Sequence, residues 1–268
     1  MTRTLLGIFP HPDDEAYAAG GTLALAAERG ASVYVVTATR GERGKHYHRD
    51  PAERRTLAEI RGDELACACG RLGAAPPRLL DLSDGGLSDV DFPSVVARLV
   101  AVIRELRPEV VVSLGPDGVY GHPDHIALYR LVVAAVRSAA GGDRFPIEPL
   151  GPAHAVSRLL LCAFPPELFR PQYERMLGTD LAGAMRLVDP RRLGASEAEV
   201  AVAVPIHAVA ERKLAAIACH RSQLPGDDPR TLFPAGIIDR LLATETFTVD
   251  GPLPGGAPLG DPFAGLPL

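Results

Sequence analysis

The sequence has no excess of positive charge, no long apolar run and no Cys-X-X-Cys pair, and each absence excludes a class of protein. Lys and Arg number 28 against 33 Asp and Glu, which gives a formal net charge of -5. Proteins that bind nucleic acid need a basic surface, so we expect no nucleic-acid partner. The N-terminal apolar run (5–9) is too short for a signal peptide or a membrane span. We therefore expect a cytoplasmic protein.

The four cysteines are not spaced as a zinc site or a redox motif would require. Cys67, Cys69, Cys162 and Cys219 all lie in apolar, alanine-rich stretches, and the sequence predicts that they are buried thiols. A G-x-G-x-x-G fingerprint is also missing after the first apolar run, which argues against a dinucleotide cofactor.

The length and composition predict one large domain. The chain has 268 residues, of which 47% are hydrophobic and 23% charged, so it can bury a full core. We expect a single α/β domain over 1–250, with catalytic loops in 1–130 and the walls of a substrate pocket in 140–225. The proline- and glycine-rich tail (251–268) cannot be helix or interior strand, which leaves an extended strap or a disordered tail.

Short apolar runs alternate with longer segments of helical spacing. The predicted strands are 5–9, 32–39, 77–82, 109–115, 158–164 and 200–206. The predicted helices are 16–29, 52–72, 93–106, 123–140 and 207–220. This order predicts a Rossmann-like, doubly wound, mostly parallel sheet with helices on both faces. In such sheets the ligand site lies at the carboxyl ends of the strands.

The first polar cluster, HPDDE at 11–15, follows the first predicted strand. Pro12 disfavours a helical backbone for His11, which ends the strand and fixes the direction of the imidazole. His11 and Asp14 are three residues apart at a strand-to-helix bend, so both can face one point. Acids in a first helical turn also satisfy unpaired N–H groups, and helix capping is therefore an alternative role for these residues.

The second polar cluster, GHPDH at 121–125, repeats this design after the fourth predicted strand. Pro123 suits the first position of a helix. His122 and His125 then lie three apart on one helix face. Because capping does not require two such clusters at equivalent strand ends, the pair predicts a functional site.

The residue types indicate a metal centre. One carboxylate and two imidazoles with an open fourth position match a catalytic zinc site, in which bound water is acidified to a pKa of about 7. The same set could hold non-haem Fe²⁺, so the spacing leaves the metal open. Beyond three ligands, four residues are free to act as a base or to stabilise an oxyanion: Asp13, Glu15, His122 and Asp124.

Three blocks together resemble the PIG-L (LmbE-like) family of metal-dependent N-acetylglucosaminyl deacetylases. They are HPDDE with the following AAGGTLA, TATRGERG after the second strand, and GVYGHPDH after the fourth. Looser matches are RGDELACACGRLG (61–73) to the family's Arg-x-x-Glu-Leu helix, LSDGGL (82–87) to its Asp-Gly loop, and KLAAIACHRSQ (213–223) to its late His-x-Ser-Gln motif. The resemblance reaches from about residue 5 to 223 and leaves 224–268 unexplained.

The resemblance implies a role for each matching residue at the metal. His11, Asp14 and His125 would be the zinc ligands, and Asp13 would be the general base. A carboxylate beside a cation stays ionised near neutral pH, which suits a base.

The resemblance also implies residues that contact the substrate. His122 would stabilise the oxyanion of the tetrahedral intermediate, and Tyr120 would assist with its hydroxyl. Arg61 and Asp84 would bind sugar hydroxyls or other parts of the substrate, although each could equally form an ordinary ion pair.

These expectations combine into one leading hypothesis and several alternatives. We expect a zinc-dependent amidohydrolase that removes an N-acetyl or similar small acyl group from a small-molecule, glucosamine-type substrate. A mycothiol-conjugate-type amidase or another acyl-amide hydrolase of the same family is the nearest alternative. A non-catalytic sugar- or metal-binding module has no need of Asp13, and an iron-dependent oxidoreductase lacks any sign of a cosubstrate site. Homo-oligomers stay open, and the Ala-, Arg- and Pro-rich composition favours a GC-rich bacterial source.

Overall fold

The computed structural model of the chain describes most of the sequence. The described residues are 2–50, 52–141, 151–166, 189–232, 237–251 and 256–267, with the isolated positions 168, 173, 174, 177, 178 and 183. Within these residues, no helix combines the length and the hydrophobicity that crossing a membrane requires.

A seven-stranded mixed sheet forms the centre of the molecule, in the order β3-β2-β1-β4-β5-β7-β6. The strands are β1 (Thr4–Phe9), β2 (Ser32–Thr39), β3 (Arg78–Leu82), β4 (Val110–Leu114), β5 (Arg158–Ala163), β6 (Val202–Pro205) and β7 (Thr244–Val249). The first five are parallel, and β7 runs antiparallel to both β5 and β6. The predicted α/β class with a mostly parallel sheet is confirmed.

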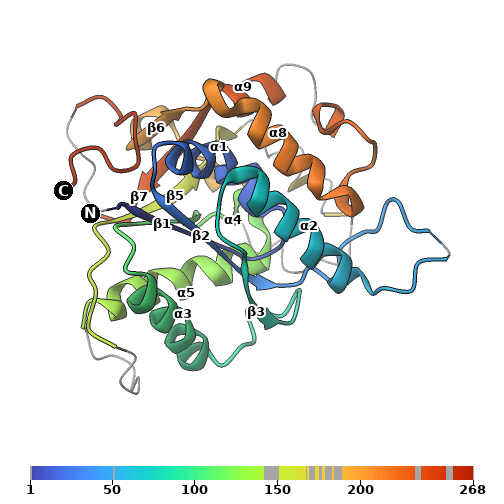
Figure 1. The fold of residues 1–268 in the computed structure, drawn as a ribbon, viewed down its shortest axis with the longest axis horizontal. Helices are drawn as coiled ribbons and strands as arrows, with labels where there is room; N and C mark the ends of the chain where they lie inside the picture. Colours follow the sequence, from blue (N-terminus) through green and yellow to red (C-terminus); the bar gives the residue numbers. More distant parts are fainter. Residues whose placement is uncertain are drawn as a thin grey trace.

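Helices cover both faces of this sheet (Figure 1). The α-helices are α1 (Asp14–Glu28), α2 (Leu57–Leu72), α3 (Phe92–Leu106), α4 (Gly118–Gly121), α5 (Pro123–Ala139), α8 (Ala210–Cys219) and α9 (Ile237–Ala243). Short 3-10 turns are η1 (Pro190–Arg192), η2 (Glu197–Glu199), η3 (His207–Val209), η4 (Arg221–Gln223) and η5 (Pro229–Leu232). Helices α1, α2 and α8 pack on one face and α3 and α5 on the other, which creates two separate hydrophobic clusters.

The six predicted strands and five predicted helices are all present, with shifts at their ends. Helix α2 begins at Leu57 rather than 52, because Thr56 and Glu59 form a capping box that sets its first turn. Helix α9 and strand β7 are not among the elements that the sequence predicted. Thr244, the first residue of β7, follows directly on Ala243, the last residue of α9, so no loop marks the change.

A buried ion pair ties the missed strand to the helical layer. Lys213 Nζ on α8 lies 2.6 Å from Glu245 Oε1 on β7, and both side chains are almost fully buried. The Glu245 carboxylate also accepts hydrogen bonds from the backbone N–H groups of Gly21 and Thr22, inside α1. Glycine at position 21 lets Ile206 pack closely against α1, since a Cβ there would lie 2.4 Å from the Ile206 side chain.

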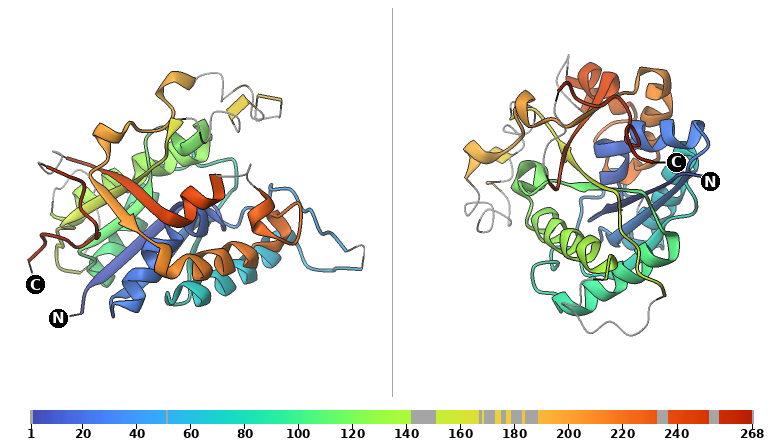
Figure 2. Two further views of the ribbon diagram at one scale, coloured as in Figure 1. Left: turned by 90° about the horizontal axis from the view of Figure 1, so that it is seen from above. Right: turned by 90° about the vertical axis from the view of Figure 1, so that its left-hand side faces the viewer.

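In the described residues 256–267 of the C-terminal tail, bends, turns and one isolated bridge pack against the body of the domain, and we call this segment the strap. Residues 256–267 lie beside the N-terminal end of β1, as the views in Figure 2 show. Leu259 bridges to Val202 of β6, and Arg158 donates hydrogen bonds to the backbone oxygens of Pro262 and Ala264.

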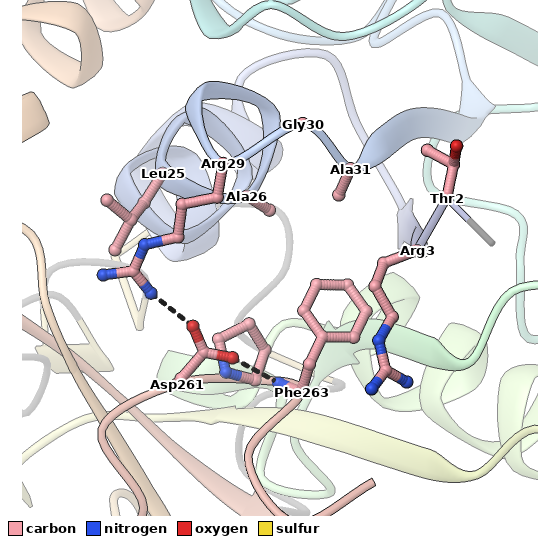
Figure 3. A pocket seen from close by; sticks show the side chains of 10 residues that line it. Thr2, Arg3, Leu25, Ala26, Arg29, Gly30, Ala31, Asp261 and Phe263 are labelled. Carbon is pink, nitrogen blue, oxygen red and sulfur yellow. Dashed lines mark hydrogen bonds and ion pairs between the residues drawn. The ribbon is translucent and has the colours of Figure 1, made fainter. Parts of the chain in front are cut away.

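Charged and aromatic side chains fasten the strap to the start of the chain (Figure 3). Asp261 forms an ion pair with Arg29, at the end of α1. The guanidinium carbon of Arg3 lies 5.6 Å from the centre of the Phe263 ring, within the range of a cation-π contact.

The prediction of four buried thiols is wrong for two of the cysteines. Cys67 on α2 and Cys219 on α8 form a disulfide, with Cα atoms 5.8 Å apart. Cys69 and Cys162 are free and buried, as expected. The paired residues are 152 positions apart, and only the packing of α2 against α8 brings them together, so short-range spacing could not reveal the bond.

We expect Glu245→Ala to destabilise the fold strongly. The change leaves the Lys213 ammonium and two helix N–H groups buried without their carboxylate, and breaking a buried pair costs about 3–5 kcal/mol. Urea unfolding followed by circular dichroism measures the free energy of unfolding. The matched control is Glu211→Ala, which removes an exposed ion pair with Arg230 and should change stability little. Equal effects of the two substitutions would contradict a structural role for the buried pair.

Candidate metal centre

The two polar clusters lie at the point where the strand order reverses. Strand β1 pairs in parallel with β2 on one side and with β4 on the other. The chain therefore fills the sheet outward from β1 to β3 and then returns to β4. The loops that follow β1 and β4 diverge above the same edge of the sheet, and this switch point is the usual ligand site of an open α/β sheet.

His11 stands between three carboxylates: one from the start of α1, one from the loop after β3 and one from the first turn of α5. Its Nδ1 lies 3.3 Å from Asp14 Oδ2, and its backbone N–H donates to the same oxygen. Its Nε2 lies 3.1 Å from Asp84 Oδ1 and 3.2 Å from Asp124 Oδ2. Because two carboxylates occupy the Nε2 side, Nδ1 is the nitrogen that remains for a metal.

His125 approaches the same Asp14 oxygen from α5. Its Nε2 lies 3.6 Å from Asp14 Oδ2 and makes no hydrogen bond within the described residues, although the side chain is 2% exposed. The ligand atoms of His11, Asp14 and His125 all lie within 4.8 Å of one another. A buried imidazole nitrogen without a partner, next to a carboxylate and a second imidazole, fits a metal ligand.

A strained turn presents Tyr120 and His122 beside these residues. Val119 has φ 67°, an outlier for a β-branched residue, and the Asp117 carboxylate holds the turn by accepting from the N–H groups of Val119 and Gly194. The ring of His122 lies 4.7 Å from that of His125, and the Tyr120 ring lies 5.4 Å from His125, between ring centres.

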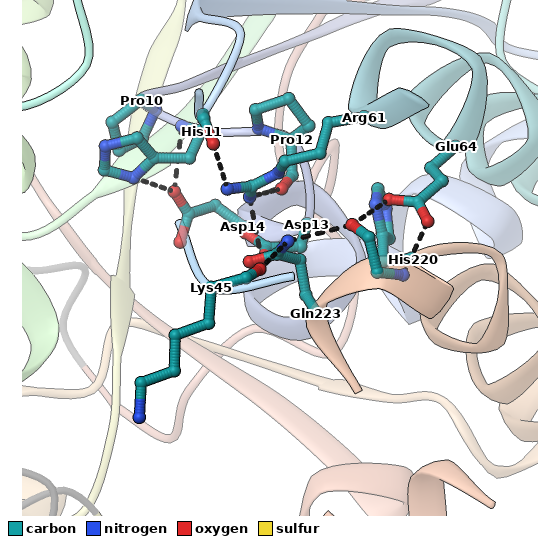
Figure 4. A network of polar contacts seen from close by, with 12 residues as sticks. Pro10, His11, Pro12, Asp13, Asp14, Lys45, Arg61, Glu64, His220 and Gln223 are labelled. Carbon is teal, nitrogen blue, oxygen red and sulfur yellow. Dashed lines mark hydrogen bonds and ion pairs between the residues drawn. The ribbon is translucent and has the colours of Figure 1, made fainter. Parts of the chain in front are cut away.

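Asp13 lies next to the cluster and is held by Arg61 (Figure 4). Arg61 Nη2 is 3.1 Å from Asp13 Oδ2, and the guanidinium also donates to the backbone oxygens of Pro12 and Gly41. Arg61 is only 4% exposed. Gly41 has φ 64°, and a Cβ there would lie 2.3 Å from the guanidinium, which explains why the RGERG segment needs glycine at this position.

The buried setting shifts the pKa values of the cluster. Burial lowers the pKa of His125 to about 4 and that of His122 to about 3, so both rings are neutral near pH 7, the form that binds metal. Burial opposes charge on His11 as well, but its hydrogen bonds to Asp124, Asp14 and Asp84 raise its pKa well above the ordinary value. Burial raises the pKa of Asp13 to about 6, against the lowering effect of Arg61.

The structure brings every predicted site residue into one region, but it gives two of them protein partners. Asp84, expected to contact substrate, bonds to His11 and accepts from the backbone N–H of Arg43. Arg61 is engaged with Asp13 and two carbonyls, so a substrate contact by either residue stays a prediction. The predicted pocket walls in 140–225 lie partly outside the described residues.

The contact of Asp124 with His11 was not predicted from the sequence. Asp124 is fully buried, and its carboxylate accepts from the N–H groups of Gly85 and Leu87 as well as contacting His11. The HPDH motif pointed to this acid as a free base or stabiliser. Carboxylates that bond to a ligating histidine fix its orientation and tautomer, and Asp84 and Asp124 are placed to do this.

A second group could also hold a metal ion. The ligand atoms of His11, His122 and Asp124 likewise lie within 4.8 Å of one another. However, the Asp124 carboxylate already accepts from two backbone N–H groups, and His122 Nδ1 accepts from the Asp124 N–H. The first group, with its unpaired His125 nitrogen, therefore fits a metal better.

Comparison with known families and sequences identifies relatives over the whole chain. The family model described as PIG-L: GlcNAc-PI de-N-acetylase matches residues 6–136. The 1D-myo-inositol 2-acetamido-2-deoxy-alpha-D-glucopyranoside deacetylase of Thermobispora bispora is 32% identical, and the alignment covers 99% of this chain and 95% of the relative.

Solved structures share the architecture. The N,N'-diacetylchitobiose deacetylase of Pyrococcus horikoshii matches with a TM-score of 0.67 at 22% identity, covering 92% of this chain and 83% of that one. The 4-carboxy-2-hydroxymuconate hydratase GalB of Pseudomonas putida KT2440 matches with a TM-score of 0.67 at 21% identity, covering 94% and 97%. At these identities the likeness shows the fold alone, and the two proteins catalyse different reactions on it.

The two candidate ligand groups predict opposite results for two single substitutions. Because His125 belongs to the better-fitting group, His125→Ala should weaken zinc binding by more than about 100-fold, beyond the 10- to 100-fold loss typical of residues behind the ligands. His122→Ala should leave zinc binding nearly unchanged. Calorimetric titration of the metal-free protein with zinc measures both. If His122→Ala abolished binding while His125→Ala retained it, the metal would belong to the second group.

Proposed function

The chain belongs to the PIG-L family, described as GlcNAc-PI de-N-acetylases, and from that premise we propose that it is a zinc-dependent amidohydrolase acting on an N-acetylglucosamine-type substrate. His11, Asp14 and His125 would hold the zinc ion, which when bound would acidify a water molecule and polarise the acyl carbonyl. Iron would suit the same donor set, so the metal itself is part of the proposal.

The observation that carries the proposal is a carboxylate that the ligand group does not need. Asp13 is adjacent to Asp14 in the chain, yet the group of ligand atoms is complete without it. Its side chain is fixed by Arg61 at 3.1 Å. A binding module needs only ligands, whereas hydrolysis needs a base within reach of the water.

The residues around the ligands divide the remaining chemistry. Asp13 would take a proton from the attacking water and return it to the leaving nitrogen of the amide, so the carboxyl group ends as it began. His122 and Tyr120, on the turn that follows β4, would stabilise the negative charge that develops on the acyl oxygen. The breaking C–N bond releases acetate and a free amine.

The substrate class follows from the relatives rather than from the geometry. The Thermobispora bispora relative is named for a glucosaminyl-inositol substrate and aligns with nearly the full length of this chain. We therefore expect a glucosamine carrying a bulky substituent, such as a polyol, in preference to free N-acetylglucosamine. A mycothiol-conjugate-type amidase remains the alternative within the family. A cytoplasmic location and self-association stay predictions of the sequence.

The proposal is tested by measuring amine release from a panel of acylated amines by zinc-loaded protein. The panel contains free N-acetylglucosamine, its inositol and malate conjugates, diacetylchitobiose and thiol conjugates. We expect release from one conjugate and little from the free sugar. Release from no member, with zinc bound, would contradict the proposed substrate class.

Asp13→Ala should separate the base from the ligands. Without its base the variant should lose about 10²- to 10⁴-fold in kcat, while its zinc affinity stays close to that of the unmodified protein. The measurements are amine release and zinc titration. The matched control is His125→Ala, which should lose turnover and zinc together. Full activity of Asp13→Ala would show that another group is the base.

A further inference from the structure

The backbone of Asp13 has a conformation that aspartate rarely adopts. Its φ is 118° and its ψ is -33°, outside the regions favoured by residues with a Cβ. Strained residues of this kind persist only where their surroundings over-determine them. On its C-terminal side, the Asp13 oxygen accepts from the N–H groups of Ala16 and Tyr17 in the first turn of α1.

The N–H of Asp13 is held by Glu15. The distance from this nitrogen to Glu15 Oε2 is 2.9 Å, and Glu15 is 0% exposed. The second carboxylate oxygen, Oε1, lies 2.6 Å from His220 Nε2. One carboxylate therefore connects the strained peptide group to a histidine 205 positions away in the chain.

His220 contacts Glu15 in the interior of the protein. Its side chain is fully buried, and the bond to Glu15 is the one hydrogen bond that its ring makes within the described residues. It lies at the end of α8, in the HRSQ turn. The turn itself is anchored to α2, because Glu64 accepts from the N–H and the hydroxyl of Ser222.

We propose that Glu15 and His220 form a clamp that holds Asp13 in its strained conformation and so positions its carboxylate, with Arg61 fixing the side chain from the opposite end. They are positioning residues, since neither belongs to the ligand group nor needs to contact substrate. This inference rests on the proposed function, because it assigns Asp13 the work of a base. Nothing in the resemblance or the comparisons gives the pair this role.

The molecule contains a second buried pair that serves as a matched control. Lys213 and Glu245 also join α8 to α1, and Glu245 also accepts from backbone N–H groups of α1. Those groups belong to Gly21 and Thr22, two turns beyond Asp13. A substitution in this pair should therefore lower the stability of the fold without moving the Asp13 carboxylate.

The kinetic test compares Glu15→Ala and His220→Ala with Glu245→Ala, each normalised to its folded fraction. The first two should lose about 10- to 100-fold in kcat, the scale expected when a catalytic group is misplaced by about 1 Å. Their KM and zinc affinity should not change. Glu245→Ala should lose stability and keep its kcat. If all three lost kcat in proportion to stability, the clamp would be only a structural element.

The conservative substitution Glu15→Gln tests whether the lost kcat can be recovered. Glu15→Gln keeps a carbonyl oxygen for the Asp13 N–H and an amide group that can donate to His220, so it should recover most of the kcat lost in Glu15→Ala. If Glu15→Gln were as slow as Glu15→Ala, the carboxylate would act through its charge, and the positioning role would be overturned.

A crystal structure of Glu15→Ala tests the clamp without any turnover. Released from Glu15, Asp13 should relax to a negative φ, and a φ that stayed near that of the unmodified protein would overturn the proposal. If Glu15→Ala does not fold, His220→Ala leaves Glu15 in place without its anchor and gives the same result. This measurement decides the clamp even if the substrate panel shows no amine release, so the two proposals fail separately.

Discussion

The parallel pairing of β1 with β4 is the constraint on which the rest of the site depends. The register places Leu5, Leu6 and Gly7 opposite Val110, Val111 and Val112. Both strands are buried on their two faces, so a slip of one residue would exchange the side chains that meet the two hydrophobic clusters. The pairing is therefore fixed, and with it the meeting of loops that are about a hundred residues apart. His11 and His125 lie 5.3 Å apart, between ring centres, because of this register.

The site concentrates charge and strain that the surrounding packing must offset. Asp84, Asp124 and Arg61 are buried, and each has partners that match its charge or its hydrogen-bonding groups. Hydrogen bonds and ion pairs of this kind restrict each of these side chains to one arrangement. Two residues with positive φ, Asp13 and Val119, flank the same network. The backbone strain of these two residues destabilises the fold, and the hydrophobic clusters on the two faces of the sheet offset that cost.

The sequence carried enough information to predict the fold class and the two clusters, because both depend on local signals. Apolar runs end at prolines and acids, and the chain order implies where parallel strands end. It could not reveal what depends on long-range packing. The sequence places Asp84 in a loop and Asp124 in a first helical turn, and only the folded chain directs both at His11. Strand β7 was not predicted because it continues from α9 without a turn residue. The disulfide was not predicted because its two cysteines come together only where α2 packs against α8.

The bond between Cys67 and Cys219 links the stability of the protein to its chemical surroundings. It closes a loop of 152 residues. In the chain-entropy model, the lost conformational entropy raises the free energy of the denatured chain by about 5 kcal/mol. Cys67 is exposed, so a small dithiol can reach the bond and open it by exchange. Where the thiol pool is reducing, the bond opens and the denatured chain regains its conformational entropy. The free energy of unfolding, which is typically about 5–15 kcal/mol, then falls by a large part of its value. The temperature at which this protein unfolds therefore depends on whether this bond is formed or reduced.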